Sequence, residues 1–249
     1  MRIRLAIAAL LLPLAAQAET LPDRLYQAQA YVTGTRAETR QDGIITSFRR
    51  VLVEVSGNPA LLSDSRVDAL ESRAAGLVED LAYIDRMSDD PHHDEQGTRD
   101  RPFDLMVHFN PGGIATVLTE LGENPWAAPR PRVLVRVNIT DHDARFALAA
   151  DTESDERHRE SLLAAADRYG LRVVLAPAEG AAPRLDDAVV TLDGTLIWSE
   201  ADFGWVGRWE LSRPNRRWSI AGVSFDDAFR DAMAGTLAEL SGHTTPQAK

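Results

Sequence analysis

The sequence predicts a mixed α+β fold made of two α/β halves, the second of which packs an antiparallel strand meander on a C-terminal helix. In some segments apolar residues alternate with a period of two, and in others they recur at helical spacing. Helix and strand patterns alternate in both halves. Near the C-terminus, however, three strand patterns follow one another through short turns, as only antiparallel neighbours can.

The predicted organisation is a signal peptide over residues 1–18, α/β halves over 19–128 and 129–243, and a disordered tail over 244–249. Arg2 and Arg4 precede an apolar run that is too short to span a bilayer, and Ala16-Gln17-Ala18 has the small-residue pattern of a cleavage site. We therefore expect cleavage after Ala18 and a periplasmic product. The two halves meet at a connector rich in proline and alanine.

The first half alternates predicted strands and helices. Thr35 and Glu38 have the spacing of a capping box, and Asn110-Pro111 is a typical helix start. The elements expected here are a strand over 25–32, a helix that stops at 56–59, a helix over 67–82, an exposed loop over 89–101, a strand over 103–109 and a helix from Asn110 to Gly122.

The second half contains the predicted meander. Its final helix begins at a capping box of Ser224 and Asp227, carries one apolar stripe and ends near Gly242. The elements expected before it are a strand over 133–139, a helix over 155–169, a strand over 171–175, a loop over 179–187, and the meander strands over 189–199, 205–212 and 217–223.

Charge and composition exclude several classes of function. The formal net charge is −11 and becomes −13 once Arg2 and Arg4 leave with the signal peptide. This acidity argues against nucleic acid and anionic lipid as partners, since both select basic surfaces. The absence of cysteine excludes disulfides, thiol catalysis and the lipid anchor of a lipoprotein. No later segment is long and apolar enough to span a membrane, and we expect no cofactor.

Several stretches resemble the proteobacterial domain-of-unknown-function family 2066 (DUF 2066). They are YVTG (31–34), RRVLVEVSGN (49–58), FDL (103–105), LG (121–122), NPW (124–126) and PRPRVLV (129–135), together with GTL (194–196) and WEL (209–211). The resemblance covers nearly all of the mature chain. It implies a secreted envelope protein without an assigned activity, and it carries no catalytic motif.

Asp141-His142-Asp143 is the best candidate for chemistry. It follows a predicted strand, where ligands of α/β sheets tend to bind, and a histidine between carboxylates can act as a base or a ligand. An acidic turn explains the same residues. The run from His92 to Glu95 is a weaker cluster in a polar loop, and we expect no metal site. Signatures of serine hydrolases, zinc proteases and phosphate-binding loops are absent.

Trp205 and Trp209 lie on one face of a predicted meander strand, which permits two interpretations. They could form an aromatic platform for sugars or proteins. The same parity also suits packing against Phe225 and Phe229 of the final helix.

The leading functional hypothesis is a non-enzymatic periplasmic protein that binds or scaffolds another component of the cell envelope, such as a protein. One alternative is a metal-assisted hydrolase that uses Asp141, His142 and Asp143. The other is a cell-wall glycan-binding module that uses Trp205 and Trp209. The sequence leaves the partner and the oligomeric state open.

Overall fold

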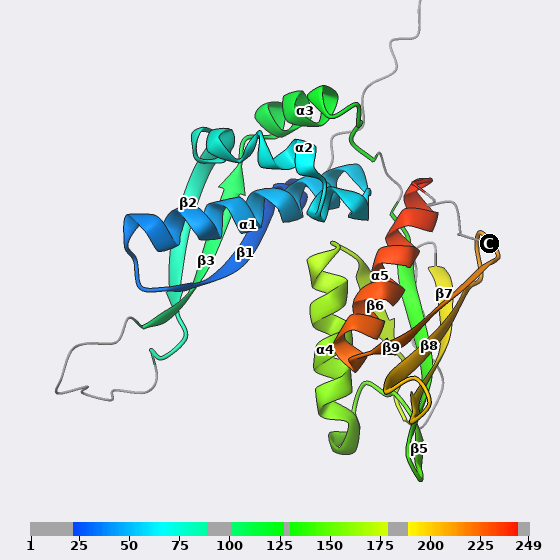
Figure 1. Cartoon of the computed structure of the whole chain (residues 1–249). Helices are drawn as coiled ribbons and strands as arrows, with labels where there is room; N and C mark the ends of the chain where they lie inside the picture. Colours follow the sequence, from blue (N-terminus) through cyan, green and yellow to red (C-terminus); the bar gives the residue numbers. More distant parts are fainter. Residues whose placement is uncertain (1–21, 89–100, 127–129, 179–188, 244–249) are drawn as a thin grey trace, which may run out of the picture.

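The computed structural model describes residues 22–88, 101–126, 130–178 and 189–243, which form two separate sheets (Figure 1). The first sheet is antiparallel with the order β1-β3-β2 and has helix α1 on one face. Its elements are β1 (Gln27–Thr33), α1 (Ala37–Ser56), α2 (Ser65–Asp68), the 3-10 helix η3 (Glu71–Leu77), β2 (Val78–Asp85), β3 (Pro102–Phe109) and α3 (Pro111–Glu120).

Buried and exposed side chains alternate along β1, and the buried ones lie on the sheet face that α1 covers. Ala28, Ala30 and Val32 are buried under α1, while the side chains between them are exposed. Gly43 brings the helix close, because a Cβ at this position would lie 2.7 Å from Val32 Cγ1 and 2.7 Å from Leu105 Cδ2. The helix ends at Gly57, whose φ of 78° is a left-handed conformation that favours glycine.

The predicted helix over residues 67–82 is wrong. The chain forms the short α2 and η3 there and then enters β2, which pairs with β3 as an edge strand. Its apolar spacing fits a helix, but the hydrogen bonds offered by β3 decide the conformation. The capping box of Thr35 and Glu38 is also wrong, since α1 begins after Arg36 without a side-chain cap.

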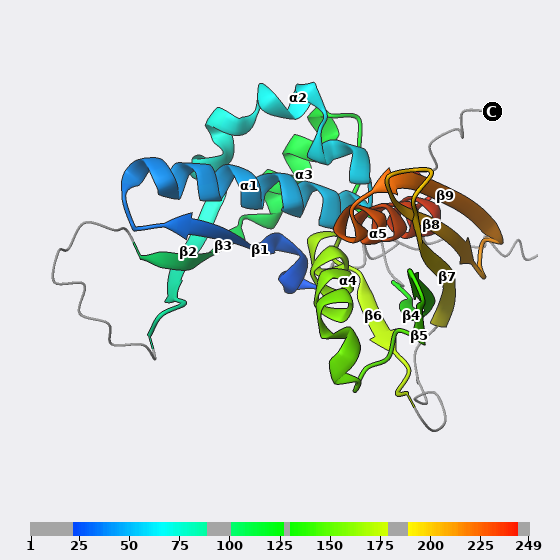
Figure 2. The same ribbon diagram turned by 60° about the horizontal axis from the view of Figure 1, so that its bottom comes forward.

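The second sheet has the order β5-β4-β7-β8-β9, and β6 pairs with β4 beside β5. Strand β4 is parallel to β6 and β7, and the remaining pairs are antiparallel. The elements are β4 (Arg132–Asp141), β5 (Ala144–Ala147), α4 (Glu156–Arg168), β6 (Arg172–Leu175), β7 (Val189–Ser199), β8 (Gly204–Leu211), β9 (Arg216–Val223) and α5 (Phe225–Ser241). Helices α4 and α5 lie together on one face of this sheet (Figures 1 and 2).

This arrangement confirms the predicted mixed α+β fold, with an antiparallel meander of β7, β8 and β9 packed on α5. Two predicted helix caps are also confirmed. Asn110 Oδ1 accepts a hydrogen bond from the backbone N–H of Gly113 at 2.7 Å, and Ser224 Oγ accepts one from that of Asp227 at 3.1 Å. Hairpin strand β5 was not expected from the sequence. No helix in the described part of the chain could cross a membrane.

Arg130 joins the two halves. Its guanidinium donates hydrogen bonds to the carbonyl oxygens of Glu54 (2.7 Å), Val55 (3.1 Å) and Trp126 (3.2 Å), and it lies 4.3 Å above the Trp126 ring. The C-terminal carbonyls of α1 therefore find their partner at the start of the second half. Arg50 adds an ion pair across the halves, 2.8 Å from Asp167 Oδ2.

Glu54 is a buried carboxyl group at this junction. Burial raises its pKa to about 8, although the charges of Arg50 and Arg130 oppose the rise. Gly170 makes room for its side chain, since a Cβ there would lie 2.9 Å from Glu54 Cγ.

Candidate functional site

Asp141, His142 and Asp143 lie at the hairpin that joins β4 to β5. His142 has a φ of 52°, which is uncommon for a residue with a side chain. Its Nδ1 lies 2.8 Å from Asp141 Oδ1 and its Nε2 lies 3.4 Å from Glu200 Oε1. Its ring stacks on Trp198 with centroids 5.6 Å apart. The imidazole therefore connects this hairpin to the turn between β7 and β8.

The carboxylates around His142 favour its protonated form. The hydrogen bond to Asp141 is the largest cause of a raised His142 pKa, with further contributions from the charges of Asp141, Glu200 and Asp143. The imidazole and its two carboxylate partners are exposed, and no described serine or threonine hydroxyl is hydrogen-bonded to His142. The described residues also contain no group of three or more His, Asp or Glu side chains arranged to hold a metal ion. The geometry supports a charged contact surface better than a catalytic centre.

Phe203 projects from the neighbouring turn between β7 and β8. Its side chain is 90% exposed, and its φ of 52° places it in the left-handed region. The turn is held by Ser199 Oγ, which donates to Asp202 Oδ2 at 2.5 Å, and by Trp198 Nε1, which donates to Glu200 at 2.9 Å. We call Phe203 with Asp141, His142, Asp143, Glu200 and Asp202 the hairpin tip.

An aromatic cluster supports the hairpin tip from below. Trp205 contacts Trp198 at 5.8 Å, Phe225 at 6.4 Å and His158 at 5.9 Å between ring centroids. His158 is only 9% exposed, and its Nε2 has no hydrogen-bond partner among the described residues. Burial lowers the His158 pKa, so this imidazole is held in its neutral form.

Trp205 and Trp209 are core residues in this structure, with exposures of 6% and 2%. Trp209 packs on Phe229 of α5 with centroids 6.3 Å apart. Two glycines accommodate it, because a Cβ on Gly194 would lie 2.4 Å from the ring and one on Gly207 would lie 2.9 Å away. An aromatic platform would need exposed rings, and neither ring is available from solvent.

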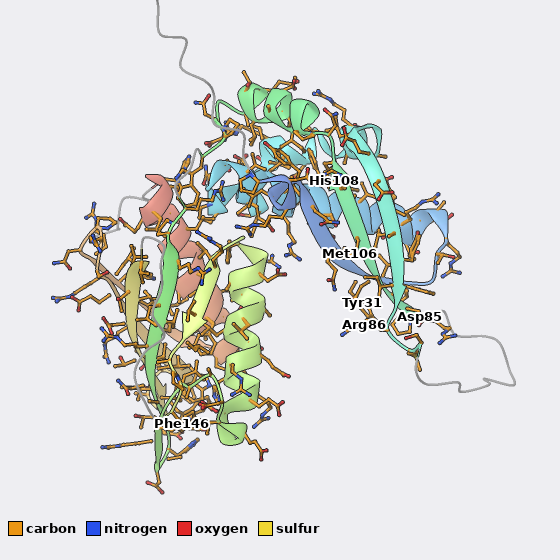
Figure 3. All side chains as sticks on the ribbon, turned by 180° about the vertical axis from the view of Figure 1, so that it is seen from behind. Tyr31, Asp85, Arg86, Met106, His108 and Phe146 are labelled. Atoms are coloured by element: carbon orange, nitrogen blue, oxygen red, sulfur yellow. The ribbon has the colours of Figure 1, made fainter. Side chains whose placement is uncertain are left out.

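The face of the second sheet that is turned away from α5 holds a hollow of about 1290 Å³. Figure 3 views the molecule from this side. Its lining combines side chains that alternate with the buried ones along β4, β7, β8 and β9 with residues 147–149 and 176–178 and with Asp231 of α5. Sequence reasoning missed this site. The signal was present in the polar residues between the buried ones, but the strand register was needed to bring them together.

Other candidates lie away from both sites. His108 belongs to the open face of the first sheet with Tyr31 and Met106 (Figure 3), and its Nε2 lies 3.1 Å from Asp23 Oδ1. The run from His92 to Glu95 lies outside the described residues.

Comparison with known proteins corrects the family expected from the sequence. Residues 18–127 match the family described as "Domain of unknown function (DUF8605)", which is a different family from DUF 2066. The matched region is less than half of the chain. The phrases that suggested DUF 2066 include the end of α1 at Gly57 and part of strand β3, which are local structural features and do not identify one family.

No curated protein matches the chain. Among solved structures, prolyl-tRNA synthetase from Cryptosporidium parvum in complex with L-proline and AMP is similar with 9% identity and a TM-score of 0.26. The alignment covers 87% of this chain, which spans about half (51%) of the synthetase chain. At this TM-score we draw nothing from the likeness.

Proposed function

We propose that this chain is a non-enzymatic binding protein of the bacterial periplasm that docks on a basic envelope protein through the hairpin tip. The observation that carries the proposal is Phe203, a 90% exposed aromatic residue in a left-handed conformation. Exposing a phenylalanine forgoes burial of a large apolar area, and a left-handed non-glycine residue costs of order 1–3 kcal/mol. Both costs are offset if the ring enters a pocket on a partner.

The charges around Phe203 define the partner. Glu200 and Asp202 precede it in the turn, and Asp141 and Asp143 lie in the neighbouring hairpin that His142 joins to Glu200. The tip therefore combines an exposed apolar ring with four carboxylates on the same two turns, which we call the acidic collar. The complementary surface is an apolar pocket with a rim of lysine and arginine.

The periplasmic location rests on the N-terminal sequence. Arg2, Arg4 and the apolar run after them have the pattern of a signal peptide, and the region matched by DUF8605 begins at residue 18, one residue before the predicted mature chain begins at Glu19. N-terminal sequencing of protein from the periplasmic fraction tests this. An intact Met1 in the cytoplasmic fraction would contradict it.

Photocrosslinking in cells tests the docking element. A benzoylphenylalanine at position 203 is expected to give a discrete product with an envelope protein that has a basic surface. The same group at Leu163, a 44% exposed position on α4, serves as the matched control. Glu200→Gln with Asp202→Asn should lower the yield at position 203, because the collar supplies the electrostatic attraction. The proposal would be refuted by equal yields of crosslinked product at positions 203 and 163. It would also be refuted if Glu200→Gln with Asp202→Asn left the yield at position 203 unchanged.

A further inference from the structure

The open face of the second sheet carries a row of polar side chains that have no partner among the described residues. Asn138 on β4, Thr195 on β7, Arg208 on β8 and Ser219 on β9 are neighbours in the strand register. Paired residues of adjacent strands lie about 4.5–5.5 Å apart, so the four form one line across the hollow. None of the four side chains has a hydrogen-bond or ion-pair partner within the described part of the chain.

The adjacent row is different because its charges are already paired. Arg136 donates two hydrogen bonds to Asp193, at 2.8 and 2.9 Å, and Arg217 donates to Glu210 at 2.8 Å. These four charges cancel. Among the described residues, Arg208 is the lining cation that has no carboxylate partner, and Asp231 of α5, whose pKa is raised by burial, lines the same hollow.

We infer that this row binds a carboxylated sugar, with Arg208 holding the carboxylate. A guanidinium presents a planar fork of donors that matches a carboxylate. Thr195 and Ser219 stand on either side of Arg208 and offer hydroxyls that both donate and accept, and Asn138 adds an amide. Sugar hydroxyls need such mixed partners on both sides of the anionic group. A simple organic anion would leave the three neutral side chains without a role.

The hollow is larger than a single sugar requires, so its volume alone does not select this ligand. Its volume of about 1290 Å³ is above the range of about 300–1000 Å³ that is usual for small-molecule sites. Both tryptophans that line it, Trp209 and Trp218, belong to strand positions that face α5 rather than the open side. The row therefore recognises its ligand by hydrogen bonds and charge rather than by stacking. This site is on a different part of the second half from Phe203, and the inference does not depend on the docking proposal.

Binding of three probes to the full mature chain tests the inference. Galacturonate carries the carboxylate and the hydroxyls, galactose lacks the carboxylate, and acetate lacks the hydroxyls. Isothermal titration or NMR is expected to show galacturonate binding with a Kd of about 1 mM or tighter, and at least about tenfold weaker binding of the other two. Acetate that binds as well as galacturonate, or no detectable galacturonate binding, would overturn the assignment.

Two matched variants locate the site. Arg208→Gln should weaken galacturonate binding at least about tenfold, because the charge-assisted pair is lost. Arg157→Gln removes the same charge from the exposed surface of α4, on the opposite face of the sheet, and should leave binding unchanged. Thr195→Val should weaken galacturonate binding without creating acetate binding. Unfolding midpoints within a few degrees of the parent would show that the variants are folded. Equal affinity in Arg208→Gln and the parent would refute the inference.

Discussion

At Gly194, one added methyl group should lower the stability of the chain through a steric clash. A Cβ there would lie 2.4 Å from Cζ3 and 2.5 Å from Cε3 of Trp209, and 3.3 Å from Val137 Cγ2. Carbon atoms pack at about 3.5–4.0 Å, so the indole would have to move by about 1 Å. Phe229 on one side and Gly207 on the other leave it little room. We expect Gly194→Ala to lower the free energy of unfolding by about 1–3 kcal/mol, the usual cost of overpacking.

Urea unfolding of four variants checks this reasoning. Gly76→Ala is the control, because a Cβ there has nothing within 4 Å, and it should change stability by less than about 0.5 kcal/mol. Trp209→Leu alone should cost several kcal/mol through the cavity it leaves, in the range of about 3–5 kcal/mol seen when large aromatics are truncated.

The double variant of Gly194→Ala with Trp209→Leu supplies the decisive comparison. The new methyl group would enter space that the indole has vacated, so the two costs should not add. We expect the double variant to be more stable than the sum of the single changes by at least about 1 kcal/mol. Strict additivity, or a Gly194→Ala change of less than about 0.5 kcal/mol, would show that the ring does not limit this position.

Three further predictions concern buried ionisable groups. The Glu54 pKa of about 8 lies above its ordinary value of 4.5, so the folded state holds a proton that the unfolded state releases, and stability should fall as pH rises from about 4.5 to about 8. Glu54→Gln should remove this loss of stability and be more stable than the parent at pH 8.5. Equal free energies of unfolding in urea at pH 8.5 would contradict the prediction. The lowered His158 pKa has the opposite consequence: stability is fully present above pH 6.5 and is lost as pH falls through that value towards the folded pKa. Urea melts of His158→Phe between pH 4.5 and 7.5 should lack this component, and an unchanged pH slope would count against it. Arg130→Gln should cost about 3–5 kcal/mol by leaving buried carbonyl oxygens unpaired, whereas Arg136→Gln breaks an exposed pair worth about 0.2–1 kcal/mol; similar losses in thermal or urea melts would refute the difference.

Local patterns were sufficient for most of the second half. The strands β7, β8 and β9 carry a period of two, and Ser224 caps α5 as its spacing with Asp227 indicates. These features depend on neighbouring residues alone, so the sequence displays them directly.

The sequence-based predictions were wrong where contacts with segments distant in the sequence determine the local conformation. Residues 78–85 become a strand because β3 offers them an edge, and no local signal outweighs their helical spacing. The candidate site divides in the same way. Asp141, His142 and Asp143 were found as a polar run after a strand, but Phe203 and the polar row were missed. The exposure of Phe203 follows from the geometry of its hairpin, and the alignment of the polar row follows from the register of the strands.

Arg208 and Trp209 show how one strand serves both binding and stability. They are adjacent in sequence, and because side chains alternate along a strand, Arg208 points to the open hollow while Trp209 enters the core against Phe229. The two faces can therefore be perturbed independently. A change at Arg208 should affect ligand binding and leave the free energy of unfolding nearly unchanged, whereas a change at Trp209 should affect unfolding first and binding only through it. If Arg208→Gln destabilised the chain as much as Trp209→Leu, the open face would be part of the structural core, and its polar row would lose its interpretation as a binding site.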